Sequence, residues 1–287
     1  MYLGPVKRYE NLHWVAWHPH QRLWNSRLVR ALKMIPVLGR ILAGVVVWVD
    51  SLILAAQVVA RRGRSLGWTA ILRQPRMPAR ALYVDCGTHR EGLQVRLVAD
   101  WFSDKLAMRT IAYEASPDYY ESAAQNLANV PNVDLRQEAL VGPDYSDSTV
   151  RLFEFGGDGK ADSLFSERSA LKGHTGFSDV PAVRLSAALE ATEPDEPVLL
   201  RMNIEGAELY VIEDLVAAGM ADRIGGYYGM WDDLSKIDPA RDADFRQLLR
   251  RADIHPIAFN DRDLSHPLRV WAVRYDMTTS LAATPRA

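Results

Sequence analysis

From residue 81 onward, short apolar runs alternate with segments of helical periodicity, and this alternation restricts the fold more than any other feature. The apolar runs that predict buried strands are 81–85, 109–114, 133–140, 198–204 and 224–230. The segments that predict helices are 93–102, 117–129, 207–218 and 239–251. Such an alternation predicts an α/β domain with a doubly wound, mostly parallel sheet, which binds ligands at the carboxyl ends of its strands.

Two other stretches of this part of the chain differ. Apolar runs at 253–260 and 266–275, separated by polar residues, predict an antiparallel hairpin that closes the sheet. Residues 141–181 are mostly polar and contain six glycines, with one strand-like interruption at 149–155. A loop of that length in a compact domain is usually an active-site lid or a disordered insert, and we expect a lid.

The charge of the chain changes near residue 80. Residues 1–80 carry 13 Lys and Arg and two acidic residues, Glu10 and Asp50, which gives a net charge of +11. Residues 81–287 carry 21 Lys and Arg and 34 Asp and Glu, which gives a net charge of −13. The first part also holds five of the eight tryptophans. We therefore predict a basic, helical N-terminal region over 1–80 and the α/β domain over 81–287.

Residues 34–60 are almost entirely apolar, with Arg40 and Asp50 as the only charges, and Arg61, Arg62 and Arg64 follow. Spanning a membrane would place Asp50 near the bilayer centre, at a cost of about 2.5 to 3.5 kcal/mol. Peripheral contact of residues 1–64 with an anionic membrane surface and packing within the protein or a homo-oligomer are the better alternatives. Nucleic acid is excluded as a partner, because no groove-reading motif accompanies this extensive apolar face.

The sequence does not predict secretion. The single cysteine, Cys86, cannot form an internal disulfide, and Met1 is followed by polar and basic residues instead of a signal-like apolar run. We expect a cytoplasmic protein, with the inner face of the membrane as its alternative location.

Acidic residues and glycines follow the first two predicted strands. Asp85 and Gly87 end the first strand, in the run VDCGTHREG, and an acid there disfavours a pyrophosphate and favours a ligand with positive charge. Glu114 ends the second strand, where a carboxylate in this type of fold binds a ribose diol. Together the two acids point to S-adenosylmethionine, a cationic nucleoside without phosphates.

Four stretches, in this order and spacing, resemble the FkbM family of S-adenosylmethionine-dependent methyltransferases: VDCGTHREG, AYEASPDYYESAAQNL, VRLSAAL and LLRMNIEGAELYVIEDL. The resemblance covers about residues 81–230 and implies a class I methyltransferase fold, usually with a hydroxyl of a sugar, polyketide or other small molecule as acceptor. It implies Glu138 and Ala139 as the adenine contact and 205–208 as the family's EGxE element. The full predicted cofactor set is Asp85, Gly87, Thr88, His89, Gly92, Glu114, Ala115, Glu138, Ala139 and Asn203.

The sequence departs from the family pattern at two positions. Glu91 stands where the first motif usually has its last glycine, and Gly92 comes one residue later. Asn203 stands where the family usually has an aspartate that could act as base or metal ligand, so dependence on a divalent metal is not assigned. No Cys/His metal-ligand spacing occurs in the sequence.

Methyl transfer to a hydroxyl benefits from a nearby base, and by position Glu205 is the first candidate, followed by His174 and Asp232. Glu208, Tyr228 and Trp231 are the candidates for the acceptor site. Each has a plainer alternative: His174 as a loop residue, Asp232 and Glu208 as helix-start charges, and the two aromatic residues as core.

Three function classes fit these features. The first is a methyltransferase that uses S-adenosylmethionine, releases S-adenosylhomocysteine and modifies a small-molecule or glycan acceptor, lipid-linked if the N-terminal region contacts a membrane. The second is a catalytically silent methyltransferase-like domain, which the departures at Glu91 and Asn203 favour and the retained acids oppose. The third, a nucleotide-sugar enzyme, is weakened because no Gly-rich phosphate cradle follows the first strand.

Overall fold

The computed structural model describes residues 36–66, 76–155, 162–166, 176–231, 234–257, 259 and 266–283. The chain forms two compact units, each described below by itself. One comprises Met1–Arg76 and Ile257–Thr279, and the other Met77–Pro256 and Ser280–Ala287.

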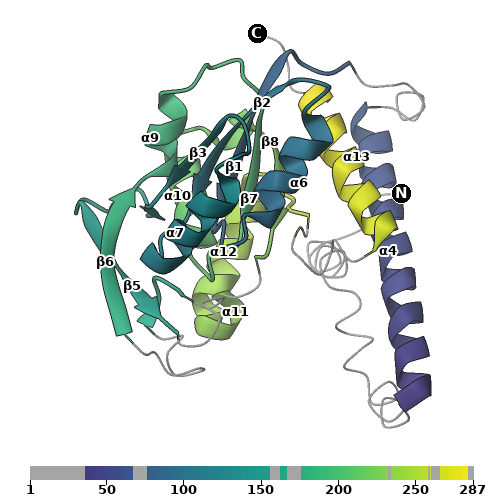
Figure 1. The fold of residues 1–287 in the computed structure, drawn as a ribbon, viewed down its shortest axis with the longest axis horizontal. Helices are drawn as coiled ribbons and strands as arrows, with labels where there is room; N and C mark the ends of the chain where they lie inside the picture. The colour runs from purple at the N-terminus through teal and green to yellow at the C-terminus, as the bar shows by residue number, and fades with distance from the viewer. Residues whose placement is uncertain are drawn as a thin grey trace. The chain divides into compact units, whose positions relative to one another are not determined.

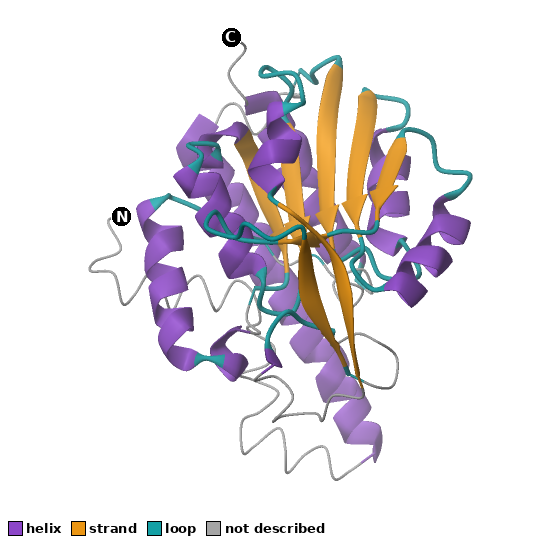
Figure 2. Cartoon of the chain, turned by 90° about the vertical axis from the view of Figure 1, so that its left-hand side faces the viewer, coloured by secondary structure: helices purple, strands orange, loops and turns teal. Residues whose placement is uncertain are grey.

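The larger unit is built on a five-stranded parallel sheet, with strand order β3-β2-β1-β7-β8 (Figures 1 and 2). The strands are β1 (Arg80–Cys86), β2 (Ala107–Tyr113), β3 (Val133–Arg136), β7 (Val198–Met202) and β8 (Ile224–Gly229). The chain runs outward from β1 through β2 to β3, then returns to the other side of β1 for β7 and β8. The order therefore reverses between β1 and β7, where ligands bind in open α/β sheets.

Helices cover both faces of this sheet (Figure 1). They are α6 (Leu93–Phe102), α7 (Pro117–Leu127), α9 (Leu185–Glu190), α10 (Glu208–Ala217), α11 (Leu234–Ile237) and α12 (Pro239–Arg251), with a 3-10 turn, η2, at Ala221–Arg223. All five residues of β7 and six of the seven of β1 are buried. Continuous burial is expected for central parallel strands, and the predicted doubly wound α/β fold is confirmed.

A second, three-stranded sheet includes part of the stretch predicted to be a lid. Its order is β4-β6-β5, formed by β4 (Ala139–Leu140), β5 (Thr149–Glu154) and β6 (Gly176–Val183). The two long strands are antiparallel and pack around Leu152 and Val180 (Figure 2). The predicted strand 133–140 is therefore two strands in two sheets. The strand-like run predicted at 149–155 is confirmed as β5, whereas residues 176–181, predicted as loop, begin β6. The lid stays a prediction.

The predicted closing hairpin was also wrong, because its second half is a helix, α13 (Pro267–Ala283). Its buried residues include Ala272, Val273, Asp276, Met277 and Ser280. Spacings of one, three, one and three are those of one helix face, not of a strand. The residues of α13 up to Thr279 belong to the smaller unit, so they add no edge to the sheet.

In the smaller unit, α13 is joined to a 31-residue helix, α4 (Pro36–Leu66). Arg62 is buried and forms an ion pair with Asp276, with Nε 2.9 Å from Oδ1. Among the helices that the structure describes, none combines the length and the apolar character needed to cross a membrane.

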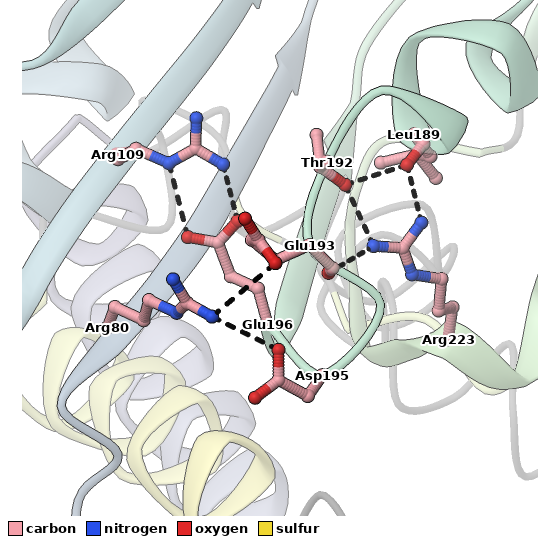
Figure 3. Close-up of polar contacts among 8 residues, drawn as sticks. All are labelled: Arg80, Arg109, Leu189, Thr192, Glu193, Asp195, Glu196 and Arg223. Carbon is pink, nitrogen blue, oxygen red and sulfur yellow. Dashed lines mark hydrogen bonds and ion pairs between the residues drawn. The ribbon is translucent and has the colours of Figure 1, made fainter. Parts of the chain in front are cut away.

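At the amino edge of the large sheet, three arginines hold the acidic segment between α9 and β7 (Figure 3). Arg109 binds the buried Glu196 with two hydrogen bonds, and Arg80 pairs with the exposed Asp195. Arg223 donates to the carbonyls of Leu189 and Glu193. The carboxyl edge, where ligands bind, is at the opposite end of the same strands.

Candidate active site

The first element of the candidate site is the turn that follows β1. The backbone N–H groups of Gly87 and Thr88 both donate to the Tyr113 carbonyl at the end of β2, over 2.9 and 3.1 Å. Gly87 has φ +81°, and a Cβ there would lie 2.2 Å from the Asn203 carbonyl oxygen. The glycine is needed so that this turn can lie against the backbone that follows β7.

Asp85, on β1 just before this turn, is fully buried and binds two side chains. Its Oδ1 accepts from Tyr83 Oη over 3.2 Å and from Arg201 Nη1 over 3.1 Å. Burial and the Asp85 charge raise the pKa of Tyr83, which therefore stays a neutral donor. Sequence reasoning missed Arg201, although one charge inside the apolar run VLLRM is a signal that a buried partner exists.

Glu114, directly after β2, is buried beneath the same turn. Its Oε2 accepts from the His89 backbone N–H over 2.7 Å and its Oε1 from the Ser116 N–H over 3.0 Å. Burial raises the pKa of Glu114 from 4.5 to about 7, and these two hydrogen bonds oppose the shift. A carboxylate has about four acceptor sites, so two remain for the hydroxyl groups of a ribose.

Two residues of the predicted cofactor turn make contacts within the protein. Gly92, at φ +55°, precedes α6, and a Cβ there would lie 2.7 Å from Leu127 Cδ2 on α7. His89, at φ +58°, stacks its ring on that of Tyr119 with centroids 5.2 Å apart. Gly92 therefore allows α6 and α7 to pack closely, and its assignment to the cofactor stays a prediction, whereas His89 binds Glu114 through its backbone N–H.

The second element is the turn that links β7 to α10. The backbone N–H of Asn203 donates to Cys86 over 2.9 Å, which joins this turn to the end of β1. Glu208 is buried, and its carboxylate accepts from the Ile204 and Gly206 N–H groups, each over 2.8 Å. These bonds agree with the helix-start alternative for Glu208, because both its oxygens accept from the turn that leads into its own helix.

Glu205 occupies the strained position of that turn. It is a non-glycine residue at φ +57° and is half-buried. Its backbone carbonyl accepts from Ser163 Oγ over 2.8 Å. Strained backbone of this kind persists where the surroundings enforce it and is frequent in active sites. Of the three predicted bases, Glu205 is the one that the structure describes; His174 and Asp232 lie outside the described residues.

Residues 162–166, which sequence reasoning did not select, lie against the Glu205 turn. Besides the Ser163 contact, Phe165 comes within 3.3 Å of a Cβ built on Gly206. Asp162 accepts from the Phe155 N–H over 3.0 Å, and burial raises its pKa, as it does that of Glu114. The segment belongs to the glycine-rich stretch 141–181, which supplied the only signal that it would lie near the site.

The predicted acceptor wall is part of the core. Tyr228 is fully buried, with its Oη 3.3 Å from Ser280 Oγ. Trp231 is 2% exposed, donates from Nε1 to the Tyr228 carbonyl and stacks on Phe245. These contacts favour the alternative that both residues are core, and their assignment to the acceptor site stays a prediction.

Several buried oxygen atoms around the carboxyl edge fit a ligand rich in hydrogen-bond donors. Within the described part of the chain, Asp85 Oδ2, Thr88 Oγ1 and Glu138 Oε2 have no hydrogen-bond partner. Buried polar atoms are normally satisfied, so unsatisfied ones need an explanation. The ribose hydroxyls, ammonium group and adenine amine of S-adenosylmethionine are donors of the required kind. Ala139, next to Glu138, is buried in a cluster with Leu152 and Val180, and Ala115 packs against this cluster.

No group of three His, Cys, Asp or Glu side chains arranged to hold a metal ion occurs among the residues that the structure describes. Asn203 leaves the family's usual aspartate position without a carboxylate. The described residues therefore assign no metal ligand.

Comparison with protein-family models adds one finding. Residues 85–225 match the model described as the methyltransferase FkbM domain. This range begins at Asp85, contains Glu114 and Glu205, and ends in β8. A search of the curated proteins found no match.

Proposed function

Because the chain belongs, over residues 85–225, to the FkbM methyltransferase family, we propose that it transfers a methyl group from S-adenosylmethionine to a hydroxyl of a small-molecule or glycan acceptor. The single observation that supports the cofactor most strongly is Glu114. It lies buried after β2, the neighbour of β1, and β1 is one of the two strands at the strand-order reversal. Its two backbone hydrogen bonds leave two acceptor sites.

In this proposal the two halves of the site have different tasks. Glu114 holds the ribose, while Asp85 Oδ2 and Glu138 Oε2 accept from other donors of the cofactor. The bound cofactor supplies a methyl carbon that its sulfonium activates for displacement. The protein therefore needs mainly to align the acceptor oxygen and to exclude water.

Glu205 is the base in this scheme. It lies on the turn after β7. The last residue of β7, Met202, pairs with Cys86, the last residue of β1, so this turn and the turn after β1 lie at the same edge of the sheet. Its carboxylate accepts the proton that the acceptor hydroxyl loses as the oxygen–methyl bond forms. Ser163 fixes the Glu205 backbone, so the segment 162–166 acts by positioning this residue.

Calorimetric titration of the purified full chain with S-adenosylmethionine and S-adenosylhomocysteine tests the cofactor. We expect micromolar binding of both by the wild type and at least about tenfold weaker binding by Glu114→Ala, which loses the acceptor atoms for a ribose diol. Glu121→Ala is the matched control, because Glu121 is an exposed carboxylate on α7. A folded wild type that binds neither compound would contradict the proposal.

The alternative is a silent methyltransferase-like domain that acts by binding. Asn203 in place of an acid favours it, and so does the use of Asp85 as the partner of Arg201, which reduces the negative charge available to a cationic ligand. Binding of cofactor without methyl transfer to any hydroxyl acceptor in a radiolabel screen would support this alternative.

A further inference from the structure

Four large apolar side chains lie exposed along one face of α4. Val45 is 52% exposed, Trp48 56%, Val49 39% and Leu52 42%. Their spacing, three, one and three residues, is that of one helix face, and we call this set the apolar stripe. Single exposed apolar residues are ordinary, but a contiguous row of four marks an interaction surface.

A different face of α4 is already covered. Leu54, Ala55 and Val58 are buried, and Arg62 fixes this face to α13 by binding both the carboxylate and the carbonyl of Asp276. The helix is therefore anchored to protein on one side while the apolar stripe points outward. A helix of this kind meets another surface along its length, as in-plane membrane helices do.

We propose that the apolar stripe docks on an anionic membrane surface, with α4 lying in the plane of the interface. Charge complementarity selects this occupant. Residues 1–80 carry 13 basic and two acidic residues, and anionic headgroups attract this net positive charge. A second copy of the chain would instead bring two regions of the same charge together. Trp48, the most exposed member of the stripe, is of a residue type that concentrates at membrane–water interfaces.

Flotation of the full chain with lipid vesicles tests this proposal. The vesicles are phosphatidylcholine alone, or equal parts of phosphatidylcholine and phosphatidylglycerol. We expect a partition coefficient at least about tenfold higher for the anionic vesicles, falling as salt is added. Trp48→Glu should lower it about tenfold, because the substitution places a charge within the stripe.

Phe177→Glu is the matched control, since Phe177 on β6 is exposed to a similar degree, 53%, and lies in the other compact unit. It should bind vesicles as the wild type does. A wild type that stays unbound, or a Trp48→Glu variant that binds equally well, would overturn the proposal. So would light scattering that shows a dimer which Trp48→Glu dissociates, because a second copy would then cover the stripe.

Quenching by brominated lipids gives a second measurement that does not depend on a disruptive variant. Trp48→Phe keeps the stripe apolar and should still bind. It should lose a measurable part of the tryptophan quenching seen with the wild type, because Trp48 would lie among the lipid chains. Unchanged quenching in this variant would overturn the docking of the stripe. Neither experiment depends on methyltransferase activity.

Discussion

Arg201 lies directly opposite Asp85 in the register of the parallel strands β7 and β1, and its Nη1 is 3.1 Å from Asp85 Oδ1. The same Nη1 donates to the Gly87 carbonyl over 2.9 Å. One buried guanidinium therefore connects β7, β1 and the turn that follows β1. The chain itself supplies the positive partner for Asp85 Oδ1, and Oδ2 is the atom left for a ligand.

Replacing Arg201 with Met should destabilise the protein by about 3 to 5 kcal/mol, because it leaves the buried Asp85 carboxylate without its charge partner. Chemical denaturation monitored by circular dichroism measures this loss. The double variant with Asp85→Asn should recover part of it, since a neutral amide is easier to bury. A loss below about 1 kcal/mol in the single variant would show that the pair carries little of the stability.

The raised pKa of Glu114 predicts how stability depends on pH. The folded protein holds the Glu114 proton up to about pH 7, whereas the unfolded chain releases it near 4.5. Between these two pH values, folding is therefore coupled to the uptake of a proton. The contribution of Glu114 to the unfolding free energy is largest below pH 4.5 and is lost as pH rises through 7. Glu114→Gln should lower the dependence of the unfolding free energy on pH between about 5 and 7. Urea titrations across this range, with Glu121→Gln as control, measure the difference; identical slopes would contradict it.

The central sheet could be predicted from the sequence because its strands are long apolar runs between clear helical segments. The C-terminal segment could not, since the apolar residues of 266–275 fit both a strand and a helix, and short apolar runs do not distinguish the two. In the second sheet, the sequence predicted β5 as the strand-like run 149–155 but did not predict β6, whose residues are mostly only partly buried or exposed and begin at a glycine.

The site was predictable where one residue type at a strand end defines it, as with Asp85 and Glu114. Contacts between distant residues were not. Arg201 is 116 positions from Asp85, and their meeting depends on the register of two strands that no local pattern records. Ser163 reached the Glu205 turn through the fold of a segment for which the sequence predicted only a loop.

Gly87→Ala should be far more damaging than Gly219→Ala, although both glycines have positive φ. At Gly87 the new methyl group would lie 2.2 Å from the Asn203 carbonyl oxygen, whereas at Gly219 nothing lies within 4 Å. Backbone strain alone costs about 1 to 2 kcal/mol, and displacement of the turn adds about as much again or more at Gly87. Thermal unfolding of the two variants compares them. Equal losses would mean that the turn relaxes without cost.

The arginine contacts at the amino edge (Figure 3) should matter for stability but not for cofactor binding. Arg109→Ala leaves Glu196, which is 2% exposed, without its partner and should cost about 1 to 3 kcal/mol. Asp195→Ala removes an exposed pair with Arg80 and should cost at most about 1 kcal/mol. Denaturation and cofactor titration of both variants separate the two effects, and a tenfold loss of cofactor affinity in either would contradict the assignment of this edge to stability.

Glu205 should show opposite effects on activity and on stability. Glu205→Gln keeps the size and the strained backbone but removes the base, and should lower the rate of methyl transfer by about 10² to 10⁴ without weakening cofactor binding. Glu205→Gly should lose activity equally, yet gain about 1 kcal/mol of stability, because glycine adopts φ +57° without strain. Single-turnover assays and denaturation of both variants test this. Full activity in Glu205→Gln would exclude Glu205 as the base. A Glu205→Gly variant that is less stable than the wild type would show that the side chain supports the fold and that its strained position has a structural origin.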